Sequence, residues 1–127
     1  MQKLYFESAW DKTIAPKDRK KIESIFAEQT FHLGDDIHFL FLWEATNHKS
    51  ERLITVLIHN GKEAPLPIRD TIITYLERDE KIATGIFNMP CDIAGKTTMP
   101  WTFIFSSANQ TLKPAQYKIQ NRISVSE

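Results

Sequence analysis

The chain has 127 residues, of which 42% are apolar and 25% charged, and its 16 Lys and Arg residues balance 16 Asp and Glu residues. This size and composition predict one globular domain over residues 1–127. The charge balance excludes a general attraction to nucleic acid or to an anionic membrane surface. The single cysteine excludes an internal disulfide framework. We expect a cytoplasmic protein without membrane insertion, because residues 1–10 carry no apolar signal core and no apolar run reaches about 18 residues.

The N-terminal part predicts an extended segment followed by one amphipathic helix. Leu4–Phe6 are expected to form a first edge strand that ends near Trp10, and residues 11–15 a connector. Pro16 suits the first turn of a helix, where its missing N–H costs nothing. The helix is predicted over residues 16–29, with Ile22, Ile25 and Phe26 as its apolar stripe.

The first half of this helix is rich in basic residues, namely Lys17, Arg19, Lys20 and Lys21. One interpretation is a solvated helix face. The other is a small basic patch that binds an acidic partner. The sequence leaves both interpretations open.

Two strong strands follow the turn at residues 34–36. The first is predicted over residues 37–44 and the second over residues 52–59. In the first, alternate positions share a face: Ile37, Phe39, Phe41 and Trp43 lie on one side, and His38, Leu40, Leu42 and Glu44 on the other. Because both faces are largely apolar, this strand is predicted to be central, with the helix covering its Leu40 and Leu42 side.

The second half of the chain predicts a hairpin and two further strands. Residues 68–77 and 82–88 are expected to pair through the polar turn at residues 78–81, and residues 89–98 to form a loop. A last strand is predicted around Tyr117 and Ile119 and extends toward Ile123.

The strand that anchors the predicted core covers residues 101–106. Trp101, Phe103 and Phe105 alternate with smaller residues, which gives the strand one aromatic face. Pro100 cannot donate to a ladder and is expected at the strand's first position. We expect a buried, structural Trp101, so that Trp101→Ala would cost roughly 3–5 kcal/mol of stability.

Short strands separated by turn signals predict a mainly β fold, an antiparallel immunoglobulin-like β-sandwich with one N-terminal amphipathic helix. The predicted structural core is Phe39, Phe41, Trp43, Trp101, Phe103 and Phe105.

Residues able to carry chemistry are few and have no recognisable spacing. Cys91 and the histidines (His32, His38, His48 and His59) offer a small hydrolase or a metal-dependent enzyme as an alternative function. Asp92, next to Cys91, would raise the thiol's pKa and so oppose nucleophilic use. A third hypothesis is a small-ligand pocket lined by Trp43 and Trp101. The favoured expectation is no catalytic residue, no metal site and no cofactor.

The element Pro100-Trp101-Thr102-Phe103-Ile104-Phe105 resembles the SLAP domain, the S-layer assembly protein domain of Firmicutes. Trp10-Asp11 before the helix, the block Leu53 to Gly61, and Ile68 to Phe87 with Asp79-Glu80 at its turn resemble the same family in order. The resemblance implies a non-enzymatic helper protein associated with accessory secretion and the cell surface. The domain often occurs duplicated in longer proteins, and here it occurs once.

The resulting hypothesis is a protein-interaction module whose partner is a secretion component or a secreted client. An unpaired strand edge is the expected physical route, since it can accept a partner strand or a second copy in a homodimer. Leu4–Phe6 and the strand near Tyr117 are the predicted edges. The predicted partner-binding residues are Lys17, Arg19, Lys20, Lys21 and Tyr117.

Overall fold

The computed structural model describes residues 2–121, apart from the side chains of residues 30–33 and 108. The elements in chain order are β1 (Lys3–Leu4), α1 (Ser8–Thr13), α2 (Pro16–Leu33), β2 (Ile37–Thr46), β3 (Arg52–Asn60), β4 (Thr71–Glu77), β5 (Glu80–Phe87), β6 (Thr97–Phe105), η1 (Ser107–Asn109) and β7 (Tyr117–Asn121). The fold is mainly β, as the sequence predicts.

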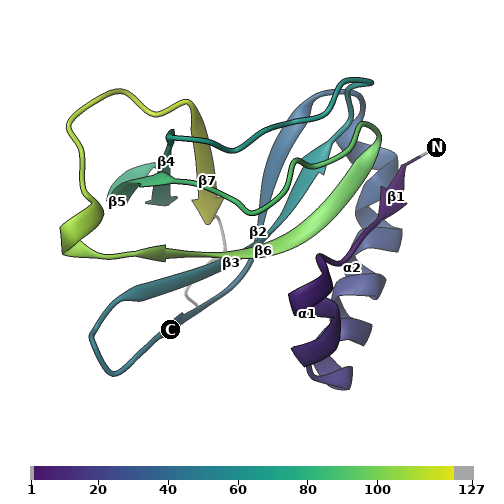
Figure 1. Cartoon of the computed structure of the whole chain (residues 1–127), viewed down its shortest axis with the longest axis horizontal. Coiled ribbons are helices and arrows are strands. Elements are labelled where there is room, and N and C mark those ends of the chain that lie inside the picture. The colour runs from purple at the N-terminus through teal and green to yellow at the C-terminus, as the bar shows by residue number, and fades with distance from the viewer. Residues whose placement is uncertain (1, 122–127) are drawn as a thin grey trace.

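The described strands form one curled sheet in the order β1-β6-β3-β2-β7-β4-β5 (Figure 1). The β2–β3, β3–β6 and β4–β5 pairs are antiparallel, whereas β1–β6, β2–β7 and β4–β7 are parallel. The prediction of an all-antiparallel sheet is therefore wrong, and the two-sheet immunoglobulin-like sandwich is not confirmed. Local alternation predicts strands, but it carries no information on which distant strand each one pairs with.

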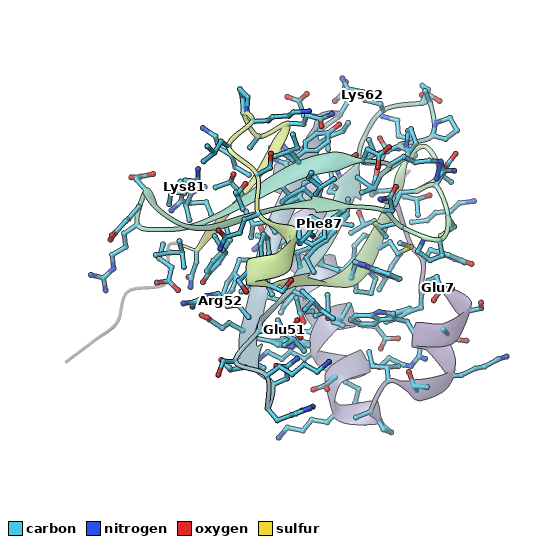
Figure 2. The ribbon with its side chains drawn as sticks, turned by 60° about the vertical axis from the view of Figure 1, so that its left-hand side comes forward. Glu7, Glu51, Arg52, Lys62, Lys81 and Phe87 are labelled. Atoms are coloured by element: carbon cyan, nitrogen blue, oxygen red, sulfur yellow. The ribbon has the colours of Figure 1, made fainter. Side chains whose placement is uncertain are left out.

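The main core lies inside the curl of this sheet. Phe87 on β5 contacts two rings of β6, with its centroid 4.9 Å from Phe103 and 4.9 Å from Phe105, both edge-to-face. Figure 2 shows Phe87 in the middle of the molecule. Because the sheet brings β5 back over β6, its aromatic face is covered by the same sheet, and no second sheet is needed.

The predicted core residues differ in their burial. Phe39, Phe103 and Phe105 are buried in the main core, whereas Phe41 and Trp101 are partly buried and pack against it. Trp101 is thus less deeply buried than its alternation predicts. It lies on β6 beyond the two residues that pair with β1. At this position β6 is therefore the edge of the described sheet, and a side chain at an edge has fewer neighbours.

Trp43 does not lie on the same face as Phe39 and Phe41, where its alternation predicts it, because β2 contains a β-bulge. The pairing of β2 with β3 shifts between Phe41 and Trp43, so that Trp43 lies opposite Thr55. An extra residue in one strand reverses the alternation beyond it. Trp43 consequently packs in the outer cluster with Leu42 rather than beside Phe39 and Phe41.

The predicted amphipathic helix is confirmed and covers the predicted side of β2. Ile22 of α2 is buried with Leu42 and Leu57 on the outer face of the sheet, and Ile25 and Phe26 pack against this cluster. The helix begins at Pro16 as expected and continues to Leu33. Gly34 follows at φ 64°, a conformation that favours glycine at a helix end.

The N-terminal segment contains a helix that the sequence pattern did not predict. β1 is an edge strand, as expected, but α1 replaces the predicted extended segment and connector. The carboxylate of Glu7 accepts hydrogen bonds from the N–H groups of Ala9 and Trp10, at 2.9 and 3.3 Å. This cap starts a helical turn within a segment whose apolar residues alternate (Figure 2).

Strand β6 begins at Thr97, so the predicted loop at residues 89–98 is too long and Pro100 is not at the strand's start. The carbonyl of Thr98 accepts from the N–H of Tyr5 in β1, which shows that Thr98 directs its backbone groups away from β3. Pro100 lies two residues further on, so its backbone groups also point away from β3. Its missing N–H therefore faces the sheet's outer edge, where no ladder bond is lost.

The predicted hairpin is confirmed as β4 and β5, although β4 begins at Thr71 rather than at residue 68. Lys81 lies at its outer end (Figure 2). The last predicted strand is β7, but it lies between β2 and β4 rather than at an edge. Tyr117 pairs with Ile73 in a five-residue parallel ladder with β4, whereas β7 meets β2 at the single pair Leu40 and Gln120. Ile123 lies outside the described residues. None of the described helices is long and apolar enough to cross a membrane.

Candidate functional site

Two of the four basic residues of α2 make contacts within the chain. The Arg19 guanidinium lies 2.6 Å from the Asp11 carboxylate and 4.5 Å from the Phe6 ring centroid. Lys21 places its Nζ 4.9 Å from the Trp43 ring centroid. Lys17 and Lys20 are exposed. The structure therefore engages two of these cations within the chain, and the role of all four in partner binding stays a prediction.

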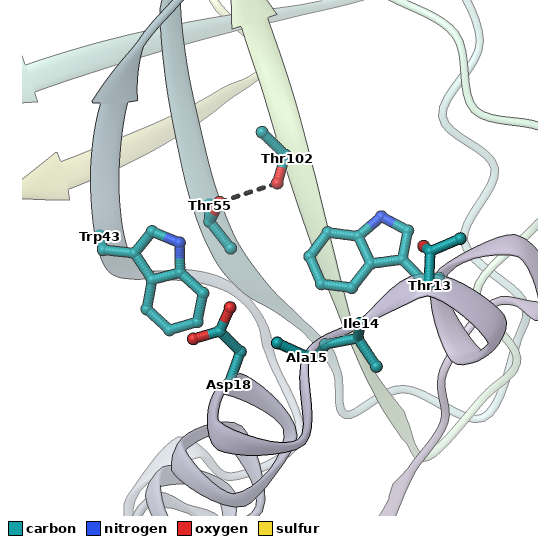
Figure 3. Close-up of a pocket in the computed structure, with 8 residues that line it drawn as sticks. Thr13, Ile14, Ala15, Asp18, Trp43, Thr55 and Thr102 are labelled. Atoms are coloured by element: carbon teal, nitrogen blue, oxygen red, sulfur yellow. Dashed lines mark hydrogen bonds between the residues drawn. The ribbon is translucent and has the colours of Figure 1, made fainter.

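A pocket of about 370 Å³ lies between the helices and the outer face of the sheet (Figure 3). Its lining residues are Trp10, Thr13, Ile14, Ala15, Asp18, Trp43, Thr55 and Thr102. The sequence predicts a pocket lined by Trp43 and Trp101. In the structure the second indole of the lining is Trp10 rather than Trp101. Trp101 stacks on Trp10 with 6.4 Å between ring centroids.

Local structure explains how the two indoles meet. α1, capped by Glu7, carries Trp10 toward the sheet, and the β-bulge turns Trp43 to the outer face. The sequence contains both signals, a carboxylate two residues before Ala9 and a long two-sided apolar strand. Neither signal has a spacing that identifies a pocket.

The polar groups of this pocket are few and distinct. The hydroxyl groups of Thr55 and Thr102 share a hydrogen bond of 2.7 Å on neighbouring strands. Asp18, in the first turn of α2, directs its carboxylate between Trp43 and the pocket space (Figure 3). Among the described residues no basic nitrogen lies within 4.0 Å of this carboxylate. The pocket thus combines two aromatic rings with one negative charge.

Cys91 lines a second pocket, of about 340 Å³, beside β1. Burial raises the pKa of its thiol, and the carboxylates of Glu7 and Asp92 raise it further. Because the thiolate is the reactive form, this environment opposes nucleophilic use of Cys91.

The histidines lie in different parts of the fold, except for the neighbouring pair His38 and His59. His59 is buried in β3, and the exposed His38 lies beside it on β2 with 6.1 Å between ring centroids. His48 lies in the turn between β2 and β3, and the side chain of His32 is outside the described set. No group of three or more His, Cys, Asp or Glu residues able to hold a metal ion occurs within the described part of the chain.

Strand β5 is the longer of the two sheet edges, since β1 has two residues and β5 has eight. The carbonyl of Ile86 accepts from the Asn109 side-chain amide of η1 at 2.6 Å, so Ile86 directs its backbone groups away from β4. Ile72, its partner on β4, bonds on its other side to Gln116. Beyond Ile86 the described sheet has no further strand.

These features describe a small mainly β domain with a helix-covered sheet, an aromatic pocket and an edge strand, β5, whose Ile86 carbonyl is bonded to Asn109. The family model described as SLAP domain matches residues 4–122, which is nearly the whole chain. The chain belongs to the SLAP domain family, and the resemblance seen in its sequence is confirmed. Comparison with curated proteins and with solved structures gives no significant match.

Proposed function

We propose that the protein is a non-enzymatic protein-interaction module that assists bacterial protein secretion or cell-surface assembly. The observation that carries this proposal is the SLAP family match over residues 4–122, since this family is associated with the surface and with secretion. The raised pKa of the Cys91 thiol adds support, because it opposes the hydrolase alternative.

Strand addition at β5 is the contact route that the sheet offers. An edge strand presents unpaired N–H and C=O groups that a partner strand can satisfy. We prefer β5 to the predicted strand near Tyr117, because β7 lies between β2 and β4 in the order of the described sheet and β5 lies at its end. In this proposal a client or secretion component supplies the eighth strand, and a second copy of the chain would use the same edge.

The variant Ile86→Pro tests this route. It removes an N–H that faces away from β4, so the ladder within the sheet keeps its hydrogen bonds. The matched control is Ile86→Val, which keeps the N–H and a β-branched side chain. The original chain and both variants are immobilised and exposed to a lysate of a SLAP-containing bacterium, and retained proteins are identified by mass spectrometry.

We expect the original chain and Ile86→Val to retain the same translocation component or exported protein, and Ile86→Pro to lose it. Circular dichroism and thermal unfolding establish that each variant is folded. Equal retention by a folded Ile86→Pro would reject strand addition at β5. A wild-type chain that retains neither a secretion component nor an exported protein would reject the proposed function itself.

A further inference from the structure

We propose that the pocket between Trp10 and Trp43 binds one cationic side chain, arginine or lysine, of a partner polypeptide, with Asp18 as the counter-ion. This inference rests on the proposed function for the nature of the partner, a polypeptide. The chemistry of the pocket itself does not depend on it.

The lining of the pocket matches an organic cation. Indole rings attract a cation placed over their faces, and the interaction is stronger where water is excluded. The half-buried Asp18 adds a full negative charge beside Trp43. Lys21 already lies over the Trp43 ring at 4.9 Å, which shows that this indole accepts a cation. Lys21 is not among the eight residues that line the pocket, so the pocket space beside Asp18 is not filled by it.

The pocket has room for a cationic side chain and carries hydrogen-bonding groups that suit one. A volume of about 370 Å³ lies at the lower end of ligand sites. A guanidinium carries five N–H donors in one plane, and a carboxylate accepts two of them side by side. Thr55 and Thr102 share one hydrogen bond, and their oxygens have further acceptor capacity for a cationic donor.

The neighbouring sheet surface favours a polypeptide over a free metabolite. Ile104 lies two residues beyond Thr102 on the same face of β6, and it is 47% exposed. Leu53, directly opposite on β3, is only partly buried. An apolar residue exposed next to a charged pocket suits a ligand with an apolar side chain near its cation. A partner segment with an arginine or lysine close to a leucine has this pattern.

The first test titrates the folded protein with N-acetyl-arginine methylamide and follows the indole N–H resonances by NMR. The neutral isostere, N-acetyl-citrulline methylamide, is the matched probe. We expect saturable shifts of Trp10 and Trp43 with a Kd on the order of 1 mM for the arginine probe and none for citrulline. Asp18→Asn should weaken binding about tenfold. Glu23→Gln, which removes an exposed carboxylate from the same helix, should leave it unchanged.

Three outcomes would overturn the cation site. The first is the absence of a saturable shift at about 20 mM probe, far above the expected Kd. The second is equal binding of the arginine and citrulline probes, which would show that the charge of the ligand contributes nothing. The third is equal binding of the arginine probe to Asp18→Asn and wild type, which would show that the charge of Asp18 contributes nothing.

A second arm distinguishes a polypeptide from a metabolite. We expect a capped Arg-Ala-Leu peptide to bind more tightly than capped arginine, and Ile104→Thr to remove that difference alone. Ile104→Thr keeps a β-branched residue on an exposed position, so the fold is preserved. Tighter binding of free arginine than of the capped peptide would assign the pocket to a metabolite and overturn the polypeptide ligand.

The retention experiment separates this inference from the proposed function. If wild type and Glu23→Gln retain an exported protein and Asp18→Asn does not, the pocket contributes to partner binding. If all three retain it equally, the proposed function stands and the pocket's role in it is rejected. If none retains a partner, the proposed function fails, and the titration still decides whether the pocket binds a cation.

Discussion

His59 should make the stability of this protein depend on pH below neutrality. Its imidazole is 1% exposed and makes two hydrogen bonds of 2.9 Å, one with the carbonyl of Gly34 through Nε2 and one with the Thr98 hydroxyl through Nδ1. Because a carbonyl only accepts, Nε2 carries the proton and Nδ1 accepts from Thr98. The Thr98 oxygen in turn accepts from the Gln2 amide at 3.1 Å. The neutral ring is thus fully paired.

The direction of the pH effect follows from the pKa of His59. Burial lowers this pKa, and the nearby His38 and Lys96 lower it further, while the bond to Gly34 opposes them. The unfolded chain then takes up a proton near pH 6.5, before the folded chain does. The free energy of unfolding therefore falls as the pH drops through 6.5 and levels off below the folded pKa. One proton gives a slope of at most about 1.4 kcal/mol per pH unit.

Urea unfolding followed by circular dichroism between pH 7.5 and 5 measures this slope. His59→Gln is the matched variant, because its side-chain amide can donate to Gly34 and accept from Thr98 without titrating. We expect the wild type to lose stability across this range and the variant to lose clearly less. The difference between the two curves isolates His59 from the other histidines. Identical slopes for both proteins would refute a buried neutral imidazole.

Three further changes test the packing. Phe103→Ala should cost about 3–5 kcal/mol in urea unfolding because the ring is 1% exposed, and Trp101→Ala less, because that ring is only partly buried; equal costs would contradict this difference. Gly61→Ala should destabilise, since a Cβ would lie 2.4 Å from the Gly34 carbonyl oxygen, and an unchanged thermal midpoint would disprove the contact. Glu7→Ala should cost about 1 kcal/mol by removing the cap of α1, with lower helical circular dichroism; unchanged helicity would contradict the cap.

Elements with a strong local pattern could be predicted from the sequence. The start of α2 follows from Pro16, and its buried face from Ile22, Ile25 and Phe26 at helical spacing. The β4–β5 hairpin follows from two apolar runs around a polar turn, where Arg78 and Asp79 adopt positive φ. In both cases the residues that decide the structure lie within one or two turns of each other.

Strand order could not be predicted, because it depends on contacts between distant segments. β7 pairs in parallel with both β2 and β4, and its own pattern around Tyr117 and Ile119 would suit an edge equally well. A proline predicts the start of a strand, yet Pro100 lies inside β6. It is tolerated there because β1 ends at Leu4 and leaves the outer edge of β6 unpaired at Pro100. Each of these outcomes is set by which strand lies alongside, and alternation does not specify that.

The sequence predicts a pocket with Trp43 but not the part of Trp10 and Asp18 in it, because the pocket depends on two local irregularities acting together. Without the Glu7 cap, Trp10 would lie in an extended segment, and without the bulge, Trp43 would point into the main core. Each irregularity changes the direction of one indole, and only the folded chain shows that both indoles line the space into which Asp18 points. A regular strand and a regular connector would bury these rings in separate places. The aromatic pocket therefore arises where the sequence departs from its own dominant pattern, as functional sites often do.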